Sequence, residues 1–271
     1  MAGDLHCHSV MSDGVMDIDT IVHYAALKGL DYMALSDHDT IAGVETAIKC
    51  GQKYGIKVIR AIEISSYDFK RLKKVHILCY NYKNPEPLFS MINKTVENRN
   101  RFGQKTIKKL QQYYVFDEKD VYNKSNKGTA IFKQHIMHTL MDYGYTDRIF
   151  GDLYAKLFKK GGLIQEKPDY PDVFDVVKAA KSTGGVVILA HPPVYNSFEL
   201  IPELIECGIN GIEVYHPRCS EEDTKNLKCI CRENNLIMTG GTDFHGFYGG
   251  TNNPIGTCVT DNAEIERILN Y

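Results

Sequence analysis

Short apolar runs alternate with longer amphipathic segments along this chain, and the alternation predicts its fold. Seven runs have the length and the β-branched or aromatic content of strands. They lie at residues 4–9, 32–35, 57–62, 75–79, 186–190, 211–217 and 236–239. Helical spacing fills most of the intervals, with Asp17 as a predicted N-cap and Gly29 and Gly55 as helix ends. Strands that alternate with helices predict a parallel sheet.

The alternation stops between residues 84 and 171, where the sequence becomes helical and charged. Helices are predicted at about 98–110, 129–143 and 147–159. From Lys94 to Lys133 there are ten Lys/Arg against four Asp/Glu. We therefore expect a body of residues 1–83 and 172–271 with a basic helical insertion, 84–171. The basic residues fit either a solvated helix surface or a phosphate-binding surface.

Bulk composition excludes several classes of protein. The chain has 271 residues, 43% of them hydrophobic, and a formal net charge of −2, so nothing global requires a nucleic acid or an anionic membrane as partner. Its eight cysteines lack the dense spacing of a disulfide scaffold, which predicts a reducing, cytoplasmic location. No apolar stretch approaches the roughly 18 to 20 residues that span a bilayer. No stable protein partner is implied.

Histidines and carboxylates gather at the ends of the predicted strands. His6 and His8 lie two residues apart and so point to the same face of a strand. Because strand ends meet at one end of a β/α barrel, residues remote in sequence converge there. Nine candidate metal ligands result: His6, His8, Asp13, His38, Glu63, His76, His191, Asp243 and His245. They exceed the four to six donors that one ion takes, so two or three ions are implied.

Four collinear segments carry a resemblance to a known family. They read Asp4-Leu5-His6-Cys7-His8-Ser9, Ser36-Asp37-His38-Asp39-Thr40, Leu189-Ala190-His191-Pro192 and Gly241-Thr242-Asp243-Phe244-His245. The chain resembles the polymerase and histidinol phosphatase (PHP) family of metal-dependent phosphoesterases, most closely its stand-alone phosphatases and 5′-to-3′ oligoribonucleases. The resemblance implies a distorted seven-stranded (β/α)7 TIM-like barrel with a helical insertion over the site and a trinuclear metal cluster.

The same resemblance implies how the ligands divide. One ion would take His6, His8, Glu63 and Asp243, a second Glu63, His76 and His191, and a third Asp13, His38 and His245. Glu63 has two carboxylate oxygens to share, and ions about 3.5–4 Å apart can clamp an in-line phosphoryl displacement. A metal-bridged hydroxide is the expected nucleophile. Manganese is the favoured ion, and iron or zinc would also suit these donors.

Substrate recognition is expected from basic residues of the insertion, because phosphate charge must be met by Arg or Lys. Arg99 or Arg101 fits the first insertion helix, and His135 fits the second, where Lys133 or Gln134 stands near the arginine found in the family. The expected catalytic residues are Glu63, Asp243 and His216. His216 would also meet a phosphate or a leaving oxygen of the substrate, and the alternative is a structural histidine at the edge of the core.

The predicted function is hydrolysis of a phosphomonoester of a nucleotide-like substrate, a nucleoside 3′,5′-bisphosphate or the 5′ end of a short RNA. Two alternatives stay open. One is a phosphatase for a small metabolite such as a sugar phosphate or histidinol phosphate, and the other is a non-catalytic, regulatory metal-binding domain.

Overall fold

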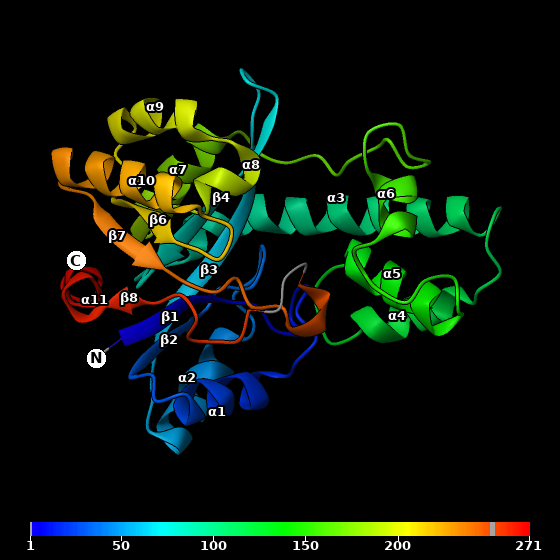
Figure 1. Ribbon diagram of the computed structural model, residues 1–271, viewed down its shortest axis with the longest axis horizontal. Coiled ribbons are helices and arrows are strands. Elements are labelled where there is room, and N and C mark those ends of the chain that lie inside the picture. The colour runs from blue at the N-terminus through cyan, green and yellow to red at the C-terminus, as the bar shows by residue number, and fades with distance from the viewer. Residues whose placement is uncertain (1, 250–252) are drawn as a thin grey trace.

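The computed structural model describes residues 2–249 and 253–271, and their strands form one nearly closed barrel (Figure 1). The strand order is β7-β6-β5-β4-β3-β2-β1-β8. The strands are β1 (Ala2–Cys7), β2 (Tyr32–Leu35), β3 (Lys57–Asp68), β4 (Lys73–Tyr80), β5 (Val186–Leu189), β6 (Gly211–Tyr215), β7 (Ile237–Gly240) and β8 (Thr260–Asp261). Thr260 on β8 accepts a hydrogen bond from the Gly240 amide of β7 at 2.8 Å, which links the two edges of the sheet. The predicted distorted barrel is confirmed, with β8 as an additional short strand.

The prediction of a wholly parallel sheet is wrong at β4. This strand runs antiparallel to both β3 and β5, whereas β1–β2, β2–β3, β5–β6 and β6–β7 are parallel. Only residues 69–72 separate β3 from β4, and a parallel crossover needs a dozen residues or more. As a consequence, the start of β4 lies at the same end of the barrel as the carboxyl ends of its neighbours.

Helices surround the barrel and extend from one side of it (Figure 1). Around the barrel lie α1 (Ile18–Leu27), α2 (Val44–Tyr54), α7 (Val173–Ser182), α8 (Pro192–Tyr195), α9 (Ile201–Glu206), α10 (Glu221–Glu233) and α11 (Asn262–Leu269), with short 3-10 turns η1 (Phe198–Leu200) and η2 (Gly246–Tyr248). The insertion contains α3 (Glu86–Leu110), α4 (Glu118–Ser125), α5 (Lys133–Asp142) and α6 (Asp152–Phe158). The predicted N-cap of α1 is confirmed, because the Asp17 side chain accepts from Thr20 N.

The α3 helix begins at Glu86 rather than near residue 98, because its first turns pack on the barrel. Leu88 and Ile92 join the hydrophobic cluster that α7 and α10 form with the outer face of the sheet. Farther along, Phe102 and Ile107 join a separate cluster with α4, α5 and α6. One helix therefore connects the barrel core to the insertion core and fixes the insertion above the end of the barrel. None of the helices in the described ranges is long and apolar enough to cross a membrane.

Candidate metal centre and substrate cavity

Strand ends bring the predicted ligands together. His6 lies in β1, His38 and His191 follow β2 and β5, and Asp243 follows β7. His76 lies near the start of β4, which reaches the same place because that strand is antiparallel. The barrel thus gathers donors from both ends of the chain, as the sequence predicts.

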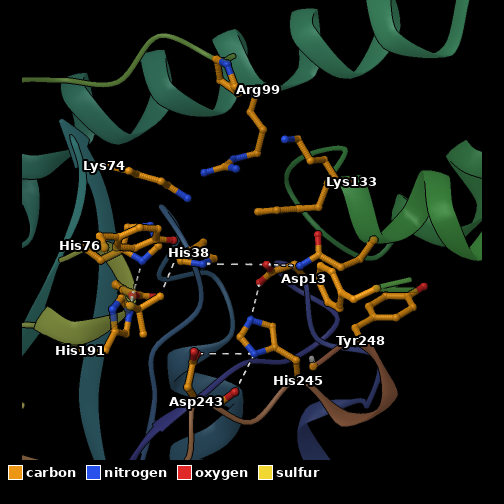
Figure 2. A pocket seen from close by; sticks show the side chains of 18 of the residues that line it. Asp13, His38, Lys74, His76, Arg99, Lys133, His191, Asp243, His245 and Tyr248 are labelled. Atoms are coloured by element: carbon orange, nitrogen blue, oxygen red, sulfur yellow. Dashed lines mark hydrogen bonds and ion pairs between the residues drawn. The ribbon is translucent and has the colours of Figure 1, made fainter. Parts of the chain in front are cut away.

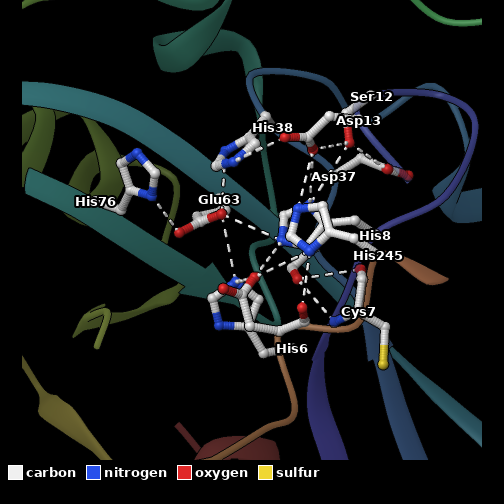
Figure 3. Close-up of polar contacts among 12 residues, drawn as sticks. His6, Cys7, His8, Ser12, Asp13, Asp37, His38, Glu63, His76 and His245 are labelled. Atoms are coloured by element: carbon white, nitrogen blue, oxygen red, sulfur yellow. Dashed lines mark hydrogen bonds and ion pairs between the residues drawn. The ribbon is translucent and has the colours of Figure 1, made fainter. Parts of the chain in front are cut away.

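Glu63 lies at the middle of this cluster (Figure 3). Its Oε1 lies 2.6 Å from His76 Nδ1 and 2.8 Å from His191 Nε2. Its Oε2 lies 3.3 Å from both His6 Nε2 and His8 Nε2. The two oxygens therefore face two separate groups of histidines, which is the geometry of a carboxylate able to bridge two ions.

Two further carboxylates border the group around His8. Asp243 Oδ1 lies 3.2 Å from His8 Nε2 and 3.5 Å from His6 Nε2. Asp13 Oδ1 lies 3.2 Å from His245 Nε2, and its Oδ2 lies 3.9 Å from His38 Nε2. Sets of donor atoms within 4.8 Å of one another include His6–His8–Glu63–Asp243, His8–Asp13–His38–His245 and His38–Glu63–His76.

The carboxylates of the cluster are held ionised. Burial would raise the pKa of Glu63, but His38, His76 and His6 hold it well below its usual value. Burial opposes ionisation of Asp13 and Asp243 too, yet neighbouring histidines, with His245 contributing most, lower both pKa values well below the usual range. Buried anions of this kind need compensating positive charge.

The histidines divide into two groups. Burial lowers the pKa of His76 to about 3 and that of His38 well below its usual value. For His6, burial acts in the same direction, but Glu213, Glu63 and Asp243 outweigh it and raise the pKa well above its usual value. Metal ions among these carboxylates would replace such protons, since histidine ligates in its neutral form.

Unpaired buried atoms test whether the residues fit a metal. Six atoms of the candidate ligands have no hydrogen-bond partner among the described residues. Four of them lie at the centre, His6 Nε2, His8 Nε2, His38 Nδ1 and Glu63 Oε2, and the other two are His76 Nε2 and His191 Nδ1. Buried polar atoms are normally satisfied, and these four face one another at contacts of 3.0 to 3.3 Å. Nitrogen and carboxylate oxygen ligands each about 2.0–2.2 Å from a shared ion would lie at this spacing. The residues fit divalent ions.

Two buried carboxylates shape the loops around the ligands. Asp4 accepts from Thr242 N at 3.0 Å and Thr242 Oγ1 at 2.6 Å, which fixes the residue before Asp243. Asp37 accepts from Ser9 N at 2.8 Å and Ser12 Oγ at 2.6 Å, on either side of the loop that leads to Asp13. These carboxylates therefore hold the loops around the candidate ligands in place.

The carboxylate that contacts Nδ1 of the His6 ring is Glu213, which the sequence reasoning missed. Its Oε1 accepts a hydrogen bond from His6 Nδ1 at 2.8 Å, and its Oε2 accepts one from the His191 amide at 2.9 Å. Glu213 is fully buried in β6, between Ile212 and Val214. A charged residue within an otherwise apolar strand is the signal that could have identified it.

A cavity of about 570 Å³ opens above the cluster. Asp13, His38, His76, His191, Asp243 and His245 line one side, and the cationic side chains of Lys74, Arg99 and Lys133 point into it from the other (Figure 2). Lys167 and several aromatic residues complete the wall. Burial and the charges of Lys74, Lys167 and Arg99 lower the pKa of Lys133 to about 8. The cavity thus has an acidic, histidine-rich pole and a cationic pole, which we define as Lys74, Arg99, Lys133 and Lys167.

Arg99 reaches the cavity from α3 and also contacts the barrel. Its Nη2 donates to Asp39 Oδ2 at 2.9 Å and to Ser65 Oγ at 3.0 Å, and its guanidinium lies 4.4 Å from the Phe132 ring centroid. Its Nε is buried with no hydrogen-bond partner in the described ranges. The residue is therefore anchored through one nitrogen and has another donor to offer.

The remaining predicted substrate residues differ in position. His216 lines the cavity, with Nε2 3.5 Å from Asp243 Oδ2. Arg101, two residues after Arg99, is exposed on α3 and does not line the cavity. His135 also lies outside the lining. It is buried, and its Nδ1 accepts from Phe132 N at 3.2 Å, which caps the start of α5. The residues of α5 that do line the cavity are Lys133 and Gln134, the latter donating to Asp13 Oδ2 at 2.9 Å.

The barrel, with its cluster of histidines and carboxylates able to hold metal ions, defines the class of the protein as a metal-dependent enzyme. The model of the PHP domain matches residues 4–188. The chain therefore belongs to the PHP family and is a metal-dependent phosphoesterase.

Individual relatives cover nearly the whole chain. A phosphoribosyl 1,2-cyclic phosphate 1,2-diphosphodiesterase of Eggerthella lenta is 36% identical, over 92% of this chain and 96% of the relative. A 3′,5′-nucleoside bisphosphate phosphatase of Chromobacterium violaceum is 25% identical, over 89% and 86%. Among solved structures, a Bifidobacterium adolescentis protein assigned as a metal-dependent phosphoesterase superposes with a TM-score of 0.90 at 30% identity, covering 98% of this chain and 95% of that one.

Proposed function

We propose that this enzyme hydrolyses a phosphate ester on a small ribose-containing substrate that carries a second phosphate group. The observation that carries the proposal is the pairing of two poles in one cavity, the candidate metal centre and the cationic pole (Figure 2). The scissile phosphate belongs at the metal centre, where divalent ions supply Lewis acidity and an activated water. The second phosphate belongs at the cationic pole, where charge-assisted hydrogen bonds favour a dianion.

We assign three ligand sets within the cluster. His6, His8, Glu63 and Asp243 would hold one ion, Glu63, His76 and His191 a second, and Asp13, His38 and His245 a third. Support comes from the division of Glu63, whose two oxygens contact different histidines. Manganese is our candidate metal, because nitrogen and carboxylate donors of this kind suit it.

The cationic pole argues for an anionic group beyond the scissile one. Burial and the charges of Lys74, Lys167 and Arg99 lower the pKa of Lys133, and a neighbouring anion would favour the charged form of this lysine. Arg99 lines the cavity, and its Nη2 bonds Asp39 and Ser65. A guanidinium carries five N–H donors, so others can meet a phosphate oxygen. We propose that the insertion, residues 84–171, serves mainly to place Arg99 and Lys133 opposite the metal centre.

Two substrate classes share this chemistry. The nucleotide-like class is a nucleoside 3′,5′-bisphosphate or a 5′-phosphorylated short RNA, and one relative's name is that of a bisphosphate phosphatase. The sugar-phosphate class is a phosphorylated ribose, favoured by the 36% identity, over nearly its full length, to an enzyme named for phosphoribosyl cyclic phosphate. Both place two phosphate groups on one pentose. The eight free cysteines suit a reducing cytoplasm as the location.

A substrate panel with Mn²⁺ tests the proposal. It compares adenosine 3′,5′-bisphosphate, a 5′-phosphorylated trinucleotide, phosphoribosyl 1,2-cyclic phosphate and ribose 5-phosphate. We expect kcat/KM to be highest for a compound with two phosphate groups and low for ribose 5-phosphate. Equal or higher kcat/KM for ribose 5-phosphate would contradict the role of the cationic pole, and inactivity on every compound would favour the non-catalytic alternative.

A further inference from the structure

The buried carboxylate of Glu213 touches two of the three proposed ligand sets without belonging to either. Its Oε1 lies 2.8 Å from His6 Nδ1, and its Oε2 lies 2.9 Å from the backbone nitrogen of His191. His6 is assigned to one ion and His191 to another. Glu213 also forms a fourth set of donor atoms with His6 and His191. Both of its oxygens already accept hydrogen bonds from these two residues, so Glu213 is placed to act on the proposed ligands rather than on an ion.

The contact with His6 sets the tautomer of the ring. An ionised carboxylate only accepts hydrogen bonds, so His6 must carry its proton on Nδ1. The other nitrogen, Nε2, then presents a lone pair toward Glu63 Oε2 and Asp243 Oδ1, at 3.3 and 3.5 Å. A ligating histidine needs this arrangement, and a partner on its second nitrogen also raises its basicity.

The contact with His191 holds an unusual backbone. His191 has φ 25° and ψ 62°, in the left-handed region that residues other than glycine rarely adopt. Proline follows it, which further restricts its conformation. The amide that donates to Glu213 belongs to this residue, so the hydrogen bond holds the turn that aims the His191 ring at Glu63, where Nε2 lies 2.8 Å from Oε1.

We propose that Glu213 is a positioning residue that couples two metal sites, by fixing the ring of His6 and the backbone of His191 with its two oxygens. The inference rests on the proposed metal centre. Glutamine at this position has nearly the same shape but only one acceptor oxygen, and its amide group is a donor. Glutamine can therefore accept from either His6 Nδ1 or the His191 amide, and its own NH2 group must then face the other N–H donor.

The test compares Glu213→Gln with wild type and with the matched control Glu264→Gln. Glu264 is another buried carboxylate, paired with Arg267 at 2.9 Å on α11, away from the centre. Mn²⁺ affinity is measured by titration with EPR detection of free Mn²⁺. We expect Glu213→Gln to lose about 10- to 100-fold in affinity, the usual effect of removing a partner of a metal ligand, and Glu264→Gln to lose none.

Kinetics supply an independent readout. In Glu213→Gln, excess Mn²⁺ should restore most of kcat and leave the substrate KM within about twofold of wild type, because all proposed ligands and the cationic pole remain. Unchanged Mn²⁺ affinity in Glu213→Gln, or an equal loss in Glu264→Gln, would overturn the inference. A wild-type protein that binds no Mn²⁺ would instead refute the proposed metal centre.

A measurement on the unmutated protein covers the case in which Glu213→Gln does not fold. In ¹⁵N-histidine-labelled, Zn²⁺-loaded wild type, NMR reports which nitrogen of each ring carries the proton. We expect His6 to be protonated on Nδ1 and to bind zinc through Nε2. A His6 ring protonated on Nε2 would reject the role of Glu213.

Discussion

Replacing Arg99 by alanine should reduce stability as well as substrate binding. The guanidinium pairs with Asp39 at 2.9 Å, with side chains 9% and 0% exposed. Removing it leaves a buried carboxylate without its counter-charge, and breaking such a pair costs about 3–5 kcal/mol. For a chain of this size each kcal/mol corresponds to roughly 2–4 °C in Tm, so we expect Tm to fall by roughly 6–20 °C.

The measurement is thermal and urea unfolding of Arg99→Ala beside Arg101→Ala, with kinetics on a doubly phosphorylated substrate. Arg101 lies on the same helix but is exposed, so its removal should change stability by no more than about 0.5 kcal/mol. Arg99→Ala should also raise KM. A variant with higher KM but wild-type Tm would refute the structural role of the pair, and a destabilised variant with unchanged KM would remove Arg99 from the substrate site.

Three further predictions concern the two poles. Asp243→Asn should keep the fold, because asparagine tolerates the φ of 51° at this position, and should lose more than about 100-fold in kcat together with Mn²⁺, as checked by circular dichroism, metal analysis and turnover. Lys74→Met should raise KM about 10- to 100-fold for a doubly phosphorylated substrate, because a hydrogen bond to a charged group contributes about 1.5–3 kcal/mol. It should leave KM unchanged for a singly phosphorylated substrate. Burial lowers the pKa of Lys133 to about 8, so its positive charge is present below that pH and lost above it. kcat/KM for the doubly phosphorylated substrate should fall as pH rises through about 8, and Lys133→Arg should abolish that part of the pH profile.

Local sequence patterns predict the barrel strands and the positions of the proposed ligands, because these ligands lie where apolar strands end. His8, His38 and His191 each follow an apolar run directly or within a few residues. In parallel strands such positions meet at one end of the barrel. The antiparallel direction of β4 was also encoded, since the four residues 69–72 allow only a hairpin. The sequence analysis misses this hairpin because it ends the third strand at Ile62, whereas β3 continues to Asp68.

Contacts between distant segments could not be read from the sequence. Nothing local distinguishes Arg99, buried against Asp39, from Arg101, which is exposed two residues later. Which of the two arginines is buried depends on how α3 packs against the barrel. Lys74 was overlooked because a lysine at a strand start usually faces solvent, whereas here it enters the cavity between the rings of Tyr170 and Tyr195.

The geometry of the centre depends on residues that bind no ion. Asp39, His191 and Asp243 have left-handed backbones, with φ of 54°, 25° and 51°. Such a conformation costs about 1–3 kcal/mol per residue, which contacts with the surroundings must offset. Asp39 N donates to the Glu63 carbonyl at 2.9 Å, and His191 N donates to the Glu213 carboxylate. The segment before Asp243 is held by Asp4. We expect a chain with all nine proposed ligands but without Glu213 to match the four family motifs and still bind metal weakly, because the motifs do not include this buried acceptor.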